Sequence, residues 1–149
     1  MLRRVHADAL AWGEAVLGAA IIETEELSGG LTSTMLALTD VTGQRSVLRL
    51  MTNEPWRNHG AELTRRERTA QEELASTQVP APTSIAVDAE GSVAGVSAHL
   101  MSRLPGTATR EVDASTVAAM VEMLALIHDV KPAEPFRTYQ SWAWEAKWA

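Results

Sequence analysis

Residues 27–51 read LSGGLTSTMLALTDVTGQRSVLRLM, a glycine-containing turn followed by two short apolar stretches. The first stretch covers residues 35–39, and the second covers residues 45–51. Residues 40–44 lie between them and are rich in turn formers. Two short apolar stretches joined by such a turn are typical of an antiparallel hairpin.

A charge on the returning strand of this hairpin needs a partner. Alternation places Val47, Arg49 and Met51 on one face of the strand, so Arg49 lies among apolar neighbours. A charged helix expected over 60–77 carries Glu67 in the middle of its few apolar residues. A buried charge is costly unless it is paired, and a pair between Arg49 and Glu67 would solve both problems. The alternative is that both side chains extend to solvent at an edge of the sheet.

The sequence on either side of the hairpin predicts an α+β domain with a five-stranded antiparallel sheet. Asp113 fits the N-cap of the last helix, which prolines end near residue 130. The expected order is helix, three strands, helix, two strands, helix. Besides the hairpin, we expect helices over 5–18, 60–77 and 114–130, and strands over 21–26, 85–87 and 93–101.

Composition excludes several classes of protein. The 149 residues contain no cysteine, which excludes a disulfide scaffold, a thiol nucleophile, thiolate zinc sites and cysteine-ligated clusters. The net charge of −6 argues against nucleic acid and anionic membranes as partners. No apolar run approaches the roughly 20 residues that span a bilayer. We therefore expect a cytoplasmic protein. The histidines His6, His59 and His99 show no metal-ligand spacing and are assigned to the surface or to loops.

Five motifs follow one another along the chain in a specific order. They are Ser28-Gly29-Gly30-Leu31-Thr32, Val47-Leu48-Arg49, Arg66-Glu67 followed by Val79-Pro80-Ala81-Pro82, Leu104-Pro105-Gly106 and Leu126-Ile127-His128. In order and spacing they resemble the N-terminal lobe of the aminoglycoside phosphotransferase family, also called the phosphotransferase enzyme family, which has a protein-kinase-like fold. The resemblance runs from about residue 27 to about residue 130.

The resemblance implies a site for ATP, with Mg²⁺ in the complete enzyme. The glycine loop would cover the nucleotide phosphates, where the absence of a Cβ lets backbone N–H groups approach the anion. Arg49 would take the role of the lysine that contacts the phosphates in the third strand, held by Glu67. No lysine occurs before residue 131. A hinge strand would offer backbone groups to the adenine edge. The implied cofactor-binding residues are Gly29, Gly30, Ser33, Arg49, Glu67, Met101, Ser102, Arg103 and Leu104.

The resemblance also implies two parts. Residues 1–104 would form the nucleotide-binding lobe, and residues 105–149 would form the hinge and the first helix of a truncated helical lobe. No catalytic or metal-binding residue is assigned, because a kinase-type loop at Asp129 needs an asparagine five residues later, where Glu134 stands. We expect the ATP-binding lobe of a small-molecule phosphotransferase that is inactive alone. The complete enzyme would transfer the phosphoryl group to a hydroxyl acceptor.

Two alternatives stay open. In the first, the chain is a non-catalytic nucleotide-binding or protein-interaction module on the same fold. In the second, it is an α+β domain in which the pair of Arg49 with Glu67 has only a structural role. Five of the seven aromatic residues lie within residues 136–148, which is typical of the start of a second lobe. Left exposed, that segment would drive self-association.

Overall fold

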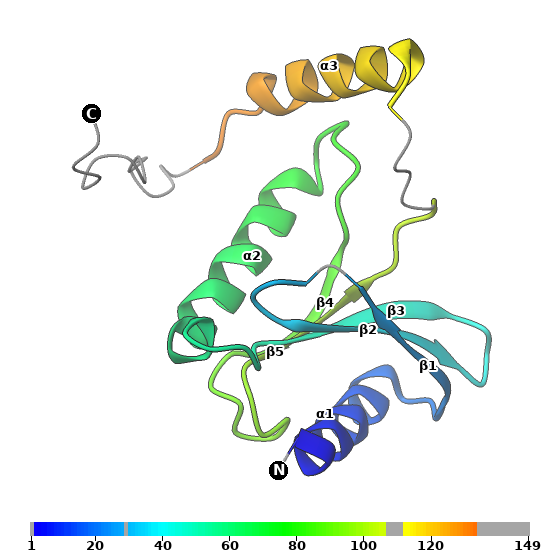
Figure 1. Ribbon diagram of the computed structural model, residues 1–149, viewed down its shortest axis with the longest axis vertical. Helices are drawn as coiled ribbons and strands as arrows, with labels where there is room; N and C mark the ends of the chain where they lie inside the picture. The colour runs from blue at the N-terminus through cyan, green and yellow to red at the C-terminus, as the bar shows by residue number, and fades with distance from the viewer. Residues whose placement is uncertain (1, 29, 107–111, 134–149) are drawn as a thin grey trace.

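A five-stranded antiparallel sheet with the strand order β1-β2-β3-β5-β4 organises the chain (Figure 1). The computed structural model describes residues 2–28, 30–106 and 112–133. The predicted α+β class and the order of elements are confirmed. The elements are α1 (Leu2–Leu17), β1 (Ile21–Leu27), β2 (Thr34–Asp40), β3 (Arg45–Leu50), a 3₁₀ turn (Trp56–His59), α2 (Gly60–Leu74), β4 (Ser84–Asp88), β5 (Ala98–Ser102) and α3 (Ala114–Asp129).

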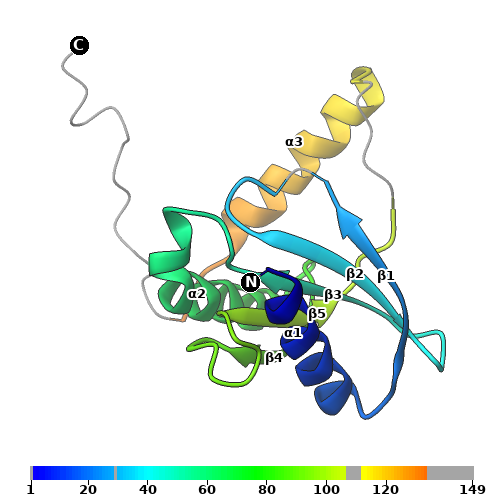
Figure 2. The same ribbon diagram turned by 60° about the horizontal axis from the view of Figure 1, so that its bottom comes forward.

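The hydrophobic core lies on the face of the sheet that α1 covers (Figure 2). Alternation sends every second side chain of the central strands toward this helix, where Trp12 and Ala9 pack against them. The strand residues of this core are Leu36, Leu38, Leu48, Leu50, Ala98 and Leu100. Because these aliphatic residues occupy one face, Arg49 and His99 project from the other.

Helix α2 packs against that second face and does so with polar residues. The sequence places Leu63 and Ala70 on the inner face of this helix, but both are only half-buried. Thr64 and Gln71 are the buried side chains, and Glu67 lies between them. Helix and sheet therefore meet through hydrogen-bonding groups, which demand partners when they leave water.

The second hairpin differs from the prediction because Asp88 organises its turn. Strand β5 begins at Ala98, five residues later than the position 93 that the sequence favours. The carboxylate of Asp88 accepts the backbone N–H groups of Ser92, Val93 and Ala94 at 2.8–3.1 Å. These N–H groups are thereby withdrawn from the sheet, so residues 92–94 wrap around the carboxylate instead of extending the strand.

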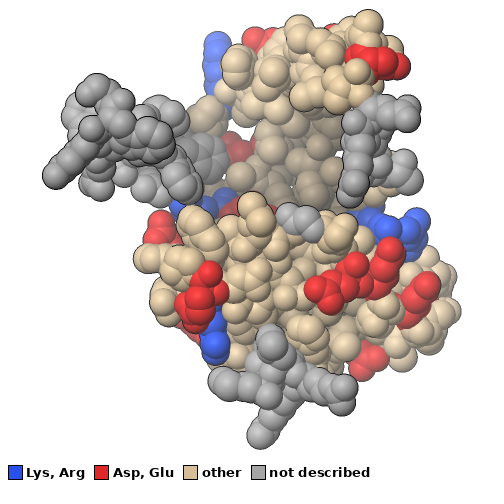
Figure 3. Space-filling model, viewed as in Figure 1, with Lys and Arg blue, Asp and Glu red and all other residues tan. Residues whose placement is uncertain are grey.

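Helix α3 begins as predicted at the N-cap Asp113, whose carboxylate accepts the N–H of Thr116 at 2.7 Å. That bond and those from the Thr116 and Ser115 hydroxyls lower the pKa of Asp113 to about 2. The apolar stripe of α3 is 44–60% exposed and consists of Val117, Met120, Val121, Leu124 and Ile127. Figure 3 shows this helix at the top of the molecule with a largely uncharged surface.

Two further expectations concern the ends of helices and the tail. Helix α2 ends at Leu74 rather than at residue 77. The aromatic segment 136–148 lies outside the described residues. No helix in the described ranges is long and apolar enough to cross a membrane.

Candidate functional site

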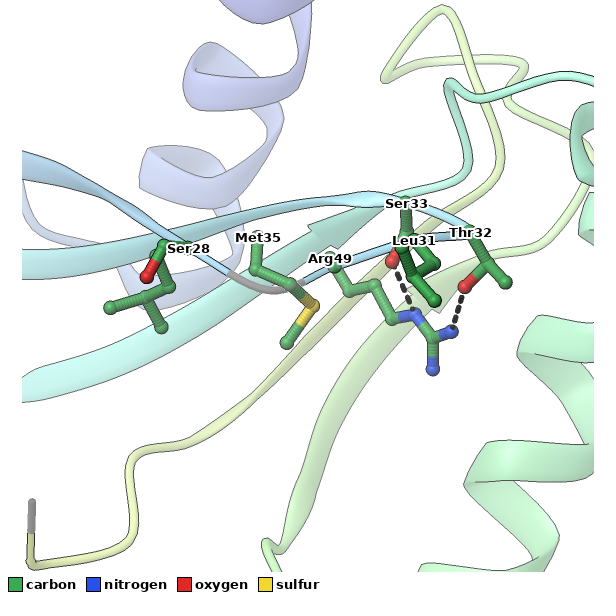
Figure 4. Close-up of a pocket in the computed structure, with 8 residues that line it drawn as sticks. Ser28, Leu31, Thr32, Ser33, Met35 and Arg49 are labelled. Atoms are coloured by element: carbon green, nitrogen blue, oxygen red, sulfur yellow. Dashed lines mark hydrogen bonds between the residues drawn. The ribbon is translucent and has the colours of Figure 1, made fainter. Parts of the chain in front are cut away.

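A pocket of about 470 Å³ lies beneath the turn that joins β1 to β2 (Figure 4). Its walls come from that turn, from the start of β2 and from one side chain of β3. The lining residues are Leu27, Ser28, Gly30, Leu31, Thr32, Ser33, Met35 and Arg49. Arg49 is the only charged residue among them, so the lining carries one positive charge.

The guanidinium of Arg49 is held at three nitrogen atoms. Nε donates to Ser33 Oγ at 3.0 Å, and Nη2 donates to Thr32 Oγ1 at 3.1 Å (Figure 4). Nη1 donates to Glu67 Oε1 at 2.5 Å. The predicted pair of Arg49 with Glu67 is confirmed. Each side chain is 25% exposed, so both are partly desolvated and the pair is screened less than a surface ion pair.

Glu67 has a second partner, on β5. Its Oε2 lies 2.9 Å from His99 Nδ1, and His99 Nε2 lies 3.0 Å from the hydroxyl oxygen of Ser84 on β4. Burial alone would raise the pKa of the Glu67 carboxyl, but the bond to His99 and the charge of Arg49 outweigh burial and lower that pKa. Glu67 is therefore a carboxylate at neutral pH.

The turn closes too tightly for any residue larger than glycine at position 30. A Cβ on Gly30 would lie 2.5 Å from the backbone carbonyl oxygen of Ser33. The absence of a side chain lets the turn fold back over Arg49. Gly30 and Ser33 both line the pocket within this turn, whereas Gly29 lies outside the described residues.

The residues expected in the hinge lie apart from this pocket. Met101 is buried at the end of β5, where its sulfur accepts a hydrogen bond from Gln71 Nε2 at 3.4 Å. Ser102 accepts the N–H of Thr83. Arg103 lies 3.8 Å from Glu25 and, with it, lines a separate pocket of about 260 Å³. Leu104 is 42% exposed.

The prediction for His99 is wrong. The residue is 1% exposed and lies in β5, neither on the surface nor in a loop. A signal existed in the sequence, because Ala98 and Leu100 alternate with it and occupy the core face. What the sequence lacks is the register that places His99 directly opposite Arg49. His6 is half-buried within α1, and only His59 of the three is exposed.

The sequence also missed Thr32 and Ser84 as partners within the cluster. Thr32 accepts a hydrogen bond from Arg49, and Ser84 lies within hydrogen-bond distance of the second ring nitrogen of His99. Within the described ranges, no group of three or more His, Cys, Asp or Glu side chains could hold a metal ion.

The sequence profile of the phosphotransferase enzyme family matches residues 23–149, which is most of the chain and includes the whole cluster around Arg49. The chain belongs to this family. The match to the phosphotransferase enzyme family agrees with the glycine turn, the basic residue of β3 and the glutamate of α2 taken together. A search of curated proteins found no match.

A solved structure shows the same fold. It is the crystal structure of a protein from Ralstonia eutropha JMP134 that is provisionally named an aminoglycoside phosphotransferase. The two chains share 21% identity with a TM-score of 0.57, and the match covers 82% of this chain. It covers 37% of the Ralstonia chain, so this chain spans little more than a third of the length of that protein.

Proposed function

We propose that residues 1–104 form the nucleotide-binding lobe of an ATP-dependent phosphotransferase that acts on a hydroxyl group of a small molecule. Residues 105–149 are the hinge and the beginning of a second, helical lobe. The single observation that carries the proposal is the Arg49 guanidinium, which is fixed by Glu67 and faces a pocket beneath a glycine turn.

The residues of this pocket fit a polyphosphate. Arginine has five N–H donors in a fixed fork. Bonds to Ser33, Thr32 and Glu67 account for one donor on each nitrogen, which leaves one N–H on Nη1 and one on Nη2. A phosphate oxygen in the pocket would accept these two, and the turn beside Gly30 has no Cβ to block the approach of the anion.

The contribution of this lobe to phosphoryl transfer is positioning and charge. Catalysis of this reaction rests on holding the phosphates in line and on neutralising developing negative charge. Arg49 supplies a fixed positive charge, and Glu67 and Ser33 orient it. We assign no catalytic base and no Mg²⁺ ligand to the described residues, and we expect the isolated chain to bind nucleotide without transferring phosphate.

Isothermal titration calorimetry with MgATP tests the role of Arg49. We expect weak binding by the wild-type chain and loss of binding in Arg49→Ala, because Arg49 is the one cation among the described residues that line the pocket. Arg68→Ala is the matched control, since Arg68 is exposed on α2 and pairs with Glu72. Absence of ATP binding by the wild type, or equal binding by Arg49→Ala, would overturn the proposal.

A second candidate function is a protein-interaction module on the same fold. The observation in its favour is the apolar stripe of α3, whose large side chains lie exposed in the described structure. An apolar stripe of this kind is typical of a surface that is covered by other protein. The two candidates differ in the ligand that they bind, which is a nucleotide in the first and another protein surface in the second.

A further inference from the structure

His99 is a buried side chain with a hydrogen-bond partner at each ring nitrogen. It is 1% exposed, yet both ring nitrogens have partners, one on α2 and the other on β4. Its pairing partner across the β3–β5 ladder is Arg49. Residues directly opposite in an antiparallel pair are neighbours on one face of the sheet. The histidine therefore lies beside the arginine and shares Glu67 with it.

The ionised carboxylate of Glu67 fixes the role of His99 Nδ1. A carboxylate only accepts hydrogen bonds, so Nδ1 of His99 carries the hydrogen that Glu67 Oε2 accepts. Nε2 lies 3.0 Å from the hydroxyl oxygen of Ser84, which holds the ring from its other side. The imidazole thus donates toward α2 and is itself oriented from β4.

Arg49 and Glu67 meet through a single pair of atoms. Arginine and carboxylate favour a two-point pair, in which two N–H groups meet both oxygens. Here Glu67 meets Arg49 through Oε1 and Nη1 only, because Oε2 is occupied by His99. Nη2 and Nε are consequently directed to Thr32 and Ser33 in the glycine turn.

We propose that His99 is a positioning residue that occupies the second oxygen of Glu67 and thereby holds the Arg49 guanidinium toward the phosphate pocket. Without this donor, Glu67 would rotate to a two-point pair and draw the guanidinium away from the turn toward α2. The consequence for nucleotide rests on the proposed function of Arg49, but the orientation of the guanidinium is a property of the chain itself.

Two amide substitutions at one position provide the test. In His99→Asn the side-chain amide lies near the place of Nδ1 and can still donate to Glu67. In His99→Gln it reaches the place of Nε2 and leaves Oε2 without its donor. The two variants are nearly matched in polarity, so a purely structural role predicts similar behaviour. His99→Leu removes both bonds and gives the upper limit of the effect, and the amide pair decides the question if His99→Leu does not fold.

The first measurement is the NMR signal of the Arg49 Nε–H group, identified by its loss in Arg49→Lys. We expect a sharp signal in the wild type and in His99→Asn. In His99→Gln we expect a broadened or shifted signal, while the backbone amide spectrum stays dispersed. An unchanged Arg49 signal in His99→Gln, or the same change in both amide variants, would overturn the inference. This measurement needs no nucleotide.

The second measurement is MgATP binding by calorimetry. We expect about tenfold weaker binding in His99→Gln and near wild-type binding in His99→Asn, the size expected for one hydrogen bond to a charged group. Wild-type affinity in His99→Gln, with Arg49→Ala inactive in binding, overturns the positioning role and leaves the proposed function standing. Absence of binding by the wild type overturns the proposed function, and the NMR result then decides the positioning role alone.

Discussion

At the scale of single residues, the cluster around Arg49 is a nearly closed set of donors and acceptors. Arg49 donates to Glu67, Ser33 and Thr32, and Glu67 receives a second bond from His99. Removal of one member of a partly buried ion pair leaves the other without its partner, which costs more than the pair itself contributes. We therefore expect the loss of any single member to lower the stability of the folded chain.

The low pKa of Glu67 gives a pH signature to this cluster. Its pKa in the folded chain lies below the ordinary 4.5, because the bond to His99 and the charge of Arg49 overcome the opposing effect of burial. The carboxylate thus contributes stability that is fully present above about pH 4.5 and is lost as pH falls through the folded pKa. We expect Glu67→Gln to lower the free energy of unfolding by about 2 kcal/mol at pH 7.

Urea denaturation of both chains at pH 7 and at pH values below 4.5 measures this effect. The difference between the wild type and Glu67→Gln should shrink toward the acid side. Glu72→Gln is the control on the same helix, because its pair with Arg68 is about half exposed and is expected to contribute less than about 0.5 kcal/mol. A difference independent of pH would show that the charge of Glu67 is not its source.

At the scale of elements, local pattern predicts strands and caps, whereas pairing between distant segments escapes it. Alternation in β3 correctly placed Arg49 on one face, and Asp113 correctly marked the start of α3. The predicted start of β5 was wrong because nothing in the sequence shows that Asp88 accepts hydrogen bonds from three backbone N–H groups. The burial of His99 opposite Arg49 was missed because register across β3 and β5 is a property of the assembled sheet.

The glycine turn gives a prediction at this scale. Gly30→Ala places a Cβ 2.5 Å from the carbonyl oxygen of Ser33, so the backbone of the turn must move. We expect the free energy of unfolding to fall by about 1–3 kcal/mol, as for other overpacked sites. Displacement of Ser33 should also weaken MgATP binding, which calorimetry measures.

The control for this substitution is another glycine with room for a side chain. Gly13 lies within α1, and a Cβ there would meet Ile21 at an ordinary 3.6 Å. Gly13→Ala is expected to raise stability by about 0.5–1 kcal/mol, since alanine favours the helix. Equal stability of Gly30→Ala and the wild type would show that the turn relaxes without cost.

At the scale of the whole molecule, the chain matches 37% of its structural relative and ends its described part with an uncovered helix. The apolar stripe of α3 lies exposed, although the helix has a well-formed cap. An exposed stripe of large apolar side chains favours contact with another protein surface. In a solution of the chain alone, a second copy is the surface available.

We therefore expect the chain to self-associate, and Leu124→Glu to reduce this association by placing a charge within the stripe. Sedimentation velocity over a wide range of concentrations measures it. Ala119→Glu adds the same charge on the opposite side of α3 and should leave association unchanged. If wild type and Leu124→Glu sediment alike, the stripe is not the contact, and the protein-interaction function loses its support.

Helix α1 has a practical consequence for dissecting this protein. The family profile begins at residue 23, after α1 has ended, yet Ala9 and Trp12 of that helix fill the core beneath β2, β3 and β5. A shorter piece cut to the limits of the profile would expose the aliphatic side chains of Leu38, Leu48 and Leu100 to water. The boundary that sequence comparison draws is therefore narrower than the unit that folds, and trimmed versions of the chain should keep the first helix.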